Sequence, residues 1–298
     1  MTTRFMDPVP GPRRLLSALT ILGAFGLVSW LAGCSVLVDA NRAQCSTDAD
    51  CKSRGAEFAG AVCKSGLCEG GSDAQWSCSS AAPAEVPGYK LTMHLTDAQS
   101  TKPLPGVVAQ LCRNLDDMCV EPVGPVVTAD EAGVVTMQVE AGFNGYVQLT
   151  SSRIAPSLYF LTPPASGDLD LPMVPLASPL AAAAIVSAAS GGMTWAKETS
   201  GIVLLTAVDC QGKPAANINF SVAGMPDPNT FIFYVVGDFP TTDVSVTDTT
   251  GYGGLVNVPA KNTTIYASLE PDGRKVSQIS ILVRAGYVSY SSVTPNSL

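Results

Sequence analysis

The sequence predicts an all-β protein, in which two tandem β-sandwiches joined by a short helix follow a small disulfide-rich module and an apolar N-terminal segment. Three observations lead to this fold class. Thr, Val, Ser, Gly and Pro are abundant and only 14% of the residues are charged, which is typical of β-sheet proteins. Several segments alternate between apolar and polar residues and are separated by turn residues. Cysteines cluster in residues 45–80.

Residues 1–33 have the three zones of an export signal. Arg13 and Arg14 precede an apolar stretch over residues 15–31, and Ala32-Gly33 stands before Cys34. The alternative is a transmembrane helix that stays in the chain. It is less favoured, because glycine and serine interrupt the apolar run and no basic flank follows it.

Leu31-Ala32-Gly33-Cys34 resembles the lipobox of bacterial lipoproteins. This resemblance implies that a peptidase removes residues 1–33 as a lipoprotein signal peptide and that Cys34 carries fatty acyl chains such as palmitate. Residues 34–44 then form a lipidated tether. Two or three acyl chains hold a protein on a membrane, because each buried methylene contributes about 0.8 kcal/mol. Ser35 stands where Asp favours the inner membrane in similar lipoproteins, so the expected location is the cell envelope, at the outer membrane.

The charge of the remaining chain argues against nucleic acid as a partner. Residues 1–33 hold three of the 17 basic and one of the 25 acidic residues, so the other 265 residues carry 14 basic against 24 acidic side chains. A net charge near −10 disfavours binding to phosphate backbones and to anionic lipid headgroups. The lipid at Cys34 is therefore the expected membrane attachment, and 265 residues suffice for two domains and a small module.

Eight further cysteines form an even set in a chain that is expected to reach an oxidising compartment, so disulfides are predicted. They are Cys45, Cys51, Cys63, Cys68, Cys78, Cys112, Cys119 and Cys210. The first four lie in a stretch too short and polar to bury its own core, and two bridges of about 2–4 kcal/mol each would stabilise it. Its spacing is similar to small cysteine-rich modules near the N-terminus of bacterial surface lipoproteins, and residues 45–80 are assigned to it.

Two metal sites are possible alternatives in this module, and neither is favoured. The spacing of the cysteines is loose for zinc and no histidine is near. Asp48 and Asp50 could bind calcium, but no further carboxylate completes an oxygen cage. We expect no metal and no cofactor. The remaining bridges are expected to join Cys112 to Cys119 across a short surface loop and, by elimination, Cys78 to Cys210; sequence alone does not fix this connectivity.

The first β-sandwich is predicted over residues 88–165. From Tyr89 to Asp97 apolar and polar residues alternate, with Leu91, Met93 and Leu95 facing in. A second strand runs to Cys112, a third follows Gly133, and a fourth covers residues 146–150.

The second β-sandwich is predicted over residues 201–293 and repeats this order. Its strands are expected at residues 202–209, 218–222, 231–236, 255–258 and 265–269. Asp97 and Asp209 are 112 residues apart, and Asp130 and Asp248 are 118 apart. The two halves therefore look like copies of one unit.

Both halves resemble the carboxypeptidase regulatory-like domains, an Ig-like or transthyretin-like β-sandwich related to the Cna-B domains of bacterial surface proteins. The residues that carry the likeness are Asp97, Pro103, Gly106, Val107, Thr128, Asp130 and Gly133, and then Asp209, Pro214, Asn217, Ile218, Thr247, Asp248 and Gly251. These are turn residues, so the resemblance implies a fold and, as in surface-located members, binding or spacing.

A linker with a short helix is predicted over residues 166–200. Ser178 is a good N-cap, Pro179 suits the first helical position, and Gly191-Gly192 follows the end. We expect this apolar helix to pack against one sandwich, and a partner-binding helix is the alternative.

The chain offers no recognisable catalytic set, so we expect a protein that is not an enzyme. His94 is the only histidine and is expected on the outer face of its strand, which excludes a histidine-based triad. Trp76 and Trp195 are expected to pack rather than to stack on sugars. The predicted function is non-catalytic binding of an envelope protein or polysaccharide, or structural spacing. The alternatives are a carbohydrate-binding module with a row of exposed aromatic side chains, and an accessory subunit of an envelope enzyme. A third alternative, an enzyme, would need a polar pocket around the Cys112–Cys119 loop.

Overall fold

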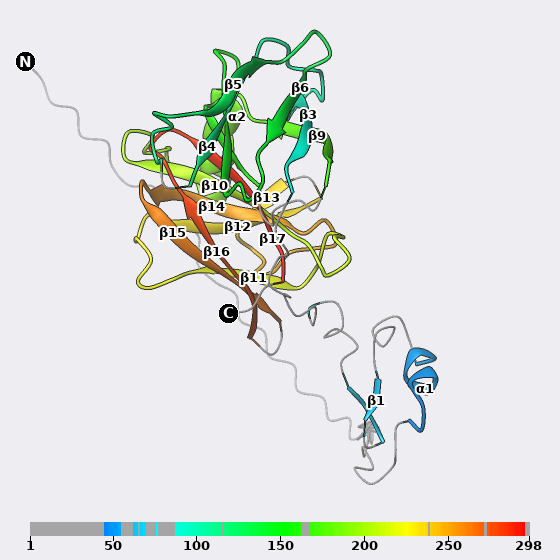
Figure 1. Ribbon diagram of the computed structural model, residues 1–298. Coiled ribbons are helices and arrows are strands. Elements are labelled where there is room, and N and C mark those ends of the chain that lie inside the picture. Colours follow the sequence, from blue (N-terminus) through cyan, green and yellow to red (C-terminus); the bar gives the residue numbers. More distant parts are fainter. Residues whose placement is uncertain are drawn as a thin grey trace, which may run out of the picture. The chain divides into compact units, whose positions relative to one another are not determined.

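The computed structural model describes residues 45–54, 62–64, 66–69, 76, 87–114, 116–161, 167–237, 239–270 and 273–295. The predicted signal peptide, Cys34 with its tether, and Cys78 lie outside the described residues. The described chain consists mostly of β-strands in sandwich-like sheets, as predicted (Figure 1). It also has two helices, of which only the one at residues 179–189 was predicted.

The cysteine-rich module contains a short helix and a small hairpin. Helix α1 spans Asp48–Lys52, and strands β1 (Val62–Lys64) and β2 (Leu67–Glu69) pair antiparallel. Thr47 caps the helix in a capping box. Its hydroxyl accepts from the Asp50 N–H, and the Asp50 carboxylate accepts from the Thr47 N–H at 2.8 Å. Such caps fix the ends of a helix that is too short to be stable by itself.

The remaining strands form one large sheet and two small ones. The large sheet has nine strands and two outermost members, β13 and β5. In spatial order they are β13 (Phe239–Thr241), β12 (Phe231–Val236), β14 (Tyr252–Pro259), β10 (Ser200–Ala207), β17 (Val288–Val293), β8 (Ser157–Phe160), β7 (Gly145–Thr150), β4 (Val108–Arg113) and β5 (Val123–Thr128).

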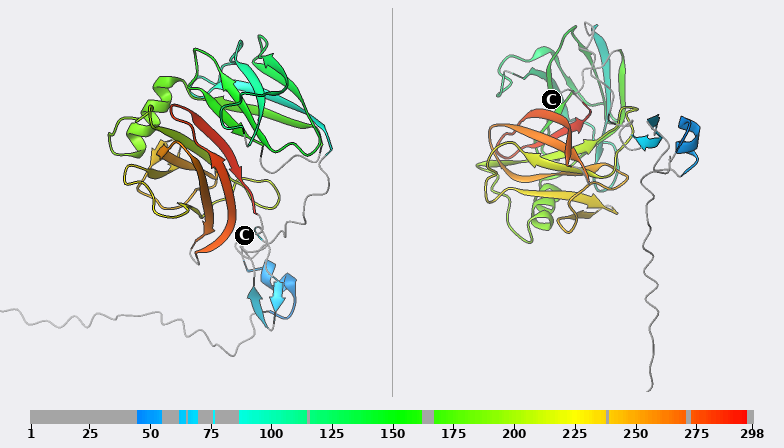
Figure 2. Two further views of the ribbon diagram at one scale, coloured as in Figure 1. Left: turned by 60° about the vertical axis from the view of Figure 1, so that its left-hand side comes forward. Right: turned by 90° about the horizontal axis from the view of Figure 1, so that it is seen from below.

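Each small sheet has three strands and covers part of the large one (Figure 2). The first consists of β6 (Val134–Val139), β3 (Tyr89–Asp97) and β9 (Leu169–Leu176). The second consists of β11 (Ile218–Val222), β15 (Asn262–Leu269) and β16 (Arg274–Leu282).

The two small sheets pack on opposite faces of the large sheet. In β7, Val147 packs with the core under the first small sheet, whereas its neighbour Tyr146 packs with the core under the second. Because successive side chains of a strand point to opposite faces, one strand serves both cores. Leu91, Met93 and Leu95 of β3 are fully buried in the first core, as the alternation predicted.

The two halves are fused by a strand pair and are not separate tandem sandwiches. Strand β17 pairs parallel with β8, with Val288 opposite Ser157 and Tyr290 opposite Tyr159. The same strand pairs parallel with β10 on its other side. The strands predicted from periodicity overlap strands of the structure, but β5, β8, β16 and β17 were not predicted. Periodicity also does not reveal which strand edges join, so the expectation of two tandem sandwiches joined by a short helix differs from the structure here.

The predicted linker over residues 166–200 also differs from the structure. It contains β9, which pairs parallel with β3 and places Val174 and Leu176 in the first core. Pro172 and Pro175 interrupt the apolar alternation of this segment, so its sequence does not resemble a strand.

Helix α2 spans Pro179–Ala189, close to its predicted limits. The Ser178 hydroxyl accepts from the Ala181 N–H at 3.1 Å, Pro179 occupies the first turn, and Gly191 takes a left-handed φ of 68° after the end. Ala182 and Val186 pack against residues of β12 and β14, whereas Leu180 is 79% exposed. The helix thus covers part of the large sheet, as the packing interpretation expects.

Equivalent turns recur in the two halves. The Asp97 carboxylate accepts from the N–H groups of the turn that follows it, and Asp209 does the same. Gly133 and Gly251 have φ near 75° and 70°, and an added Cβ would lie 2.5 Å from the carbonyl of Leu95 or 2.4 Å from that of Ala207. Strands β3, β6 and β9 of the first half therefore correspond to β10, β14 and β17 of the second.

Candidate functional site

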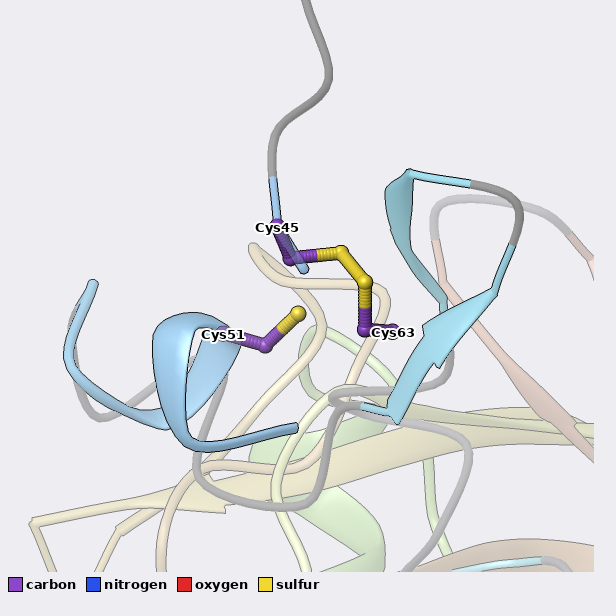
Figure 3. Close-up of side chains that lie close together, drawn as sticks. All are labelled: Cys45, Cys51 and Cys63. Atoms are coloured by element: carbon purple, nitrogen blue, oxygen red, sulfur yellow. A yellow bond between two sulfur atoms is a disulfide. The ribbon is translucent and has the colours of Figure 1, made fainter. Parts of the chain in front are cut away.

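The cysteine-rich module is closed by disulfides. Cys45 is bonded to Cys63 with a Cα–Cα distance of 5.7 Å. Figure 3 shows the sulfur of Cys51 beside this bridge, and Cys51 is itself disulfide-bonded. The three sulfur atoms lie within 4.8 Å of one another, a spacing that would suit a metal. Sulfurs oxidised to disulfides are not thiolate ligands, however, so the module fits a bridged framework.

The two acidic side chains of this module serve its backbone. The Asp48 carboxylate accepts from the Cys63 N–H at 2.8 Å and so joins helix to hairpin. Hydrogen bonds from Ser46 and Thr47 lower the pKa of Asp50 to about 2. Both carboxylates are therefore engaged in turn and cap contacts, in line with the interpretation that preferred turn residues over a calcium site.

The second disulfide joins Cys112 to Cys119, the pair expected from their short separation, with a Cα–Cα distance of 5.2 Å. It closes a loop on β4, where Cys119 has a left-handed φ of 53°. The Asp116 carboxylate accepts from the backbone N–H groups of Val120 and Glu121. The loop is thus held by its own residues. Cys210 is also disulfide-bonded, and its expected partner Cys78 lies outside the described residues.

A buried arginine joins the two halves beneath this loop. Arg284 follows β16 and is only 8% exposed. Its guanidinium donates to the Gln148 side-chain oxygen and to the Tyr146 hydroxyl, both on β7. The Tyr146 hydroxyl in turn donates to the Asp116 carbonyl at 2.6 Å, and the guanidinium carbon lies 5.4 Å from the centres of the Tyr146 and Tyr287 rings. We call Arg284, Tyr146, Gln148 and Tyr287 the seam cluster.

The seam cluster was not predicted from the sequence. Arg284 stands alone between apolar residues in Leu282-Val283-Arg284-Ala285-Gly286, and a lone charge in such a run is the signal that could have identified it. The two terminal nitrogens of the Arg284 guanidinium donate hydrogen bonds within the fold. Its third nitrogen, Nε, has no hydrogen-bond partner among the described residues. The cluster therefore links the end of β16 in the second half to β7 in the first half.

Neither of two depressions lined by described residues includes residues of the Cys112–Cys119 loop. One depression of about 200 Å³ lies at residues 222–230 and 258–264, and another of about 340 Å³ lies between α2 and residues 192–197. His94 is on the outer face of β3, as predicted, with its Nε2 3.3 Å from the Asp170 carboxylate. Neither His94 nor Asp170 lines either of these two depressions.

The two exposed aromatic side chains among the described residues, Phe239 and Tyr252, do not form a row. Phe239 is 74% exposed and lies opposite Val236 in the β12–β13 register, whereas Tyr252 precedes Gly253, which lies opposite Tyr234 of β12. Since alternate residues face opposite sides, Phe239 and Tyr252 lie on opposite faces of the large sheet. Trp76 is buried in a core cluster, and the indole N–H of Trp195 donates to the Ser200 carbonyl. Both tryptophans pack, as expected.

Burial raises the pKa values of five tyrosines, which are Tyr89, Tyr146, Tyr159, Tyr234 and Tyr290. Burial raises the pKa of Tyr146 to about 12 despite the nearby Arg284, and burial raises that of Tyr290 to about 12. The Tyr290 hydroxyl accepts from the Ala177 N–H, and its ring stacks on Tyr159. Because the folded protein favours the neutral phenol, this contribution to stability is complete below pH 10 and is lost as pH rises toward 12.

We therefore expect alkaline titration to occur in two phases. Absorbance at 295 nm should show that Tyr146 and Tyr290 stay neutral until the chain unfolds between about pH 10 and 12, whereas all tyrosines should ionise near pH 10 in urea. The late phase should coincide with loss of the β-sheet circular dichroism signal, and Tyr290→Phe should reduce its amplitude. Complete ionisation near pH 10 with an unchanged circular dichroism spectrum would contradict this expectation.

Within the described part of the chain, no helix is both long and apolar enough to cross a bilayer.

Comparison with known proteins finds solved structures only. No family model matches the chain, and no curated protein matches it. The Bacillus anthracis TIE protein aligns with 71% of this chain at 12% identity and a TM-score of 0.24; this chain spans about a third of its length, 34%. The shaft pilin SpaA of Lactobacillus rhamnosus GG aligns over 71% of this chain and 98% of its own, at 15% identity and a TM-score of 0.22. GBS52, the minor pilin of Streptococcus agalactiae, aligns over 70% and 96%, at 12% identity and a TM-score of 0.21. The β-sandwich assignment accordingly rests on the strand registers of the chain itself.

Proposed function

We propose that this protein is a lipid-anchored cell-envelope protein that acts as a non-catalytic binding or spacer protein. The observation that carries the proposal is the sequence Leu31-Ala32-Gly33-Cys34 at the end of an apolar stretch. Lipid at Cys34 would tether the described sandwich on a membrane surface, at the outer membrane if Ser35 directs it there.

The folded part of the chain supports this proposal in two ways. The disulfides Cys45–Cys63 and Cys112–Cys119 belong to an oxidising compartment outside the cytoplasm. The polar groups that converge at the seam cluster are consumed in joining the two halves, which suits a stiff structural body. A partner of such a body would be an envelope protein or a polysaccharide that contacts its outer faces.

The anchor is tested by three full-length chains expressed in a Gram-negative host. The unaltered chain is expected in the outer-membrane fraction, and mass spectrometry of its N-terminal peptide should show acylated Cys34. Cys34→Ser should leave residues 1–33 attached and carry no lipid. Ser35→Asp should keep the lipid and shift the protein to the inner-membrane fraction. An unmodified amino terminus upstream of Cys34 in the unaltered chain would refute the anchor.

The binding role is tested separately. The acylated full chain is purified from an envelope extract, and the Cys34→Ser chain is added to the same extract and purified in the same way. Both chains should co-purify with the same protein or polysaccharide. Retention of none by either chain would favour the spacer role, and turnover of a retained polysaccharide would contradict a non-catalytic protein.

A further inference from the structure

Strand β6 leaves one edge of the first small sheet open. Val134 directs its N–H and carbonyl to the turn at Asp130, away from β3. Because alternate residues of a strand direct these groups to the same side, Thr136 and Gln138 also direct theirs away from β3. No described residue hydrogen-bonds these backbone groups, and both residues are exposed. The edge therefore offers two donors and two acceptors to an added strand.

The other outer strands of the large sheet and the two small sheets carry features that oppose such an addition. Strand β16, for example, begins with the charged residues Arg274 and Lys275 and has a bulge in its register with β15. Pro125 lies in β5, Pro240 in β13, and two prolines lie in β9. Proline removes a donor and blunts a sheet edge. In β11 the Ile218 N–H is occupied by the Thr247 hydroxyl. Strand β6 contains neither proline nor a charged residue, and its register with β3 has no bulge.

The second half shows what this edge accepts. Strand β14 follows the same aspartate-glycine turn as β6 and pairs antiparallel with β10 as β6 does with β3. Its other edge is occupied by β12, which is antiparallel, with Phe231 opposite Val256 and Tyr234 opposite Gly253. The equivalent edge in the first half carries no such strand. An antiparallel strand of apolar and β-branched residues therefore fits β6.

We propose that β6 pairs antiparallel with β6 of a second copy of this chain. Its sequence, Val134-Val-Thr-Met-Gln-Val139, supplies the apolar and β-branched residues that such an edge accepts. With a two-fold axis through Met137, Thr136 of one copy lies opposite Gln138 of the other, and the free backbone groups form about four hydrogen bonds. The first small sheets of the two copies, each formed by β6, β3 and β9, then become one continuous six-stranded sheet.

The residues that pair across this edge are uncharged. Thr136 and Gln138 are neutral, so no like charges face each other at the two hydrogen-bonded positions between copies. Glu140 lies beyond these positions, opposite Val134 of the other copy and near the Asp130 carboxylate that accepts from the Val134 N–H. The Glu140 charge is, however, paired with Arg113 of its own chain. Strand β6 itself contributes nothing to the net charge of −8, which comes from residues outside it. Salt near 0.15 M screens the repulsion between charges of the two copies that are more than about 8 Å apart.

Cysteine cross-linking tests the register directly. In an antiparallel hydrogen-bonded pair the Cα atoms are about 5.5 Å apart, within disulfide reach, whereas the diagonal pairs are about 7–8 Å apart. A mixture of full-length Thr136→Cys and Gln138→Cys chains, mildly oxidised, should give a band of twice the chain mass on a non-reducing gel. Its yield should exceed that of either variant alone by about ten-fold. Equal yields in all three samples would overturn the proposed pairing, as would a cross-link to a protein of different mass.

A charge variant supplies an independent test without cysteines. Thr136→Lys/Gln138→Lys places lysines opposite each other and should weaken self-association in sedimentation equilibrium by about ten-fold or more. The control, Ser187→Lys/Gln211→Lys, adds the same charge at exposed positions elsewhere and should associate like the unaltered chain. Circular dichroism verifies that each variant is folded. A monomeric unaltered chain at millimolar concentration, or equal association of both variants, would also overturn the proposal.

Discussion

Replacing Arg284 with methionine is expected to lower the free energy of unfolding by about 3 kcal/mol. Methionine fills much of the same space but cannot donate to Gln148 or to the Tyr146 hydroxyl. Both acceptors are held at the junction of the two halves, and hydrogen bonds from a charged donor are worth about 1.5–3 kcal/mol each, less the cost of burying that charge. Urea unfolding monitored by circular dichroism measures the loss.

A surface arginine serves as the matched control for this prediction. Arg113 is about half exposed and pairs with Glu140, so Arg113→Met should cost less than about 1 kcal/mol. Arg284→Lys keeps the charge but cannot reach both acceptors, and it should fall between the two. If Arg284→Met unfolds at the same urea concentration as Arg113→Met, the seam cluster does not stabilise the junction.

Replacing Gly254 with alanine is expected to destabilise the large sheet by about 3 kcal/mol. Gly254 lies in β14 between β10 and β12, and an added Cβ would be 2.2 Å from the Val203 carbonyl oxygen and 3.0 Å from the Phe233 ring. The closer contact is with backbone, which cannot rotate away. Two paired strands would have to separate at this point, and thermal unfolding should occur at a markedly lower temperature.

Gly167 offers the same substitution without the contact. No atom lies within 4 Å of an added Cβ there, and the residue is exposed, so Gly167→Ala should change stability by no more than about 0.5 kcal/mol. Equal effects of the two substitutions would show that β14 and β10 are not as closely paired as the structure has them.

Much of the strand content could be predicted from periodicity. The alternation at residues 89–97 gave the limits of β3, and the runs at 218–222 and 231–236 coincide with β11 and β12. The capping residues around α2 were equally informative, because serine, proline and glycine act locally. Such signals depend on neighbours in the sequence, and these elements form where their own residues favour them.

What could not be predicted depends on contacts between distant segments. Neither Ser157–Tyr159 nor Val288–Tyr290 was predicted as a strand, and nothing in either segment indicates that the two pair. Strand β9 was missed because two prolines disrupt its pattern, although its position beside β3 satisfies its remaining backbone groups. The seam cluster was missed because it also depends on segments far apart in the sequence. Arg284 hydrogen-bonds to Tyr146, which lies 138 residues earlier, and this contact is visible only in the fold.

The position of β17 has a consequence for how the chain folds. This strand is formed by residues 288–293, yet it lies between β10 and β8 in the interior of the nine-stranded sheet. Neither repeat can therefore be excised as a transferable module, because each would lose a central neighbour. Residues 157–160 must wait for a partner synthesised more than a hundred residues later, so completion of the sheet is intrinsically slow. Until then the edges of β8 and β10 are exposed together, which makes the interval before closure the time at which this protein is most prone to aggregate.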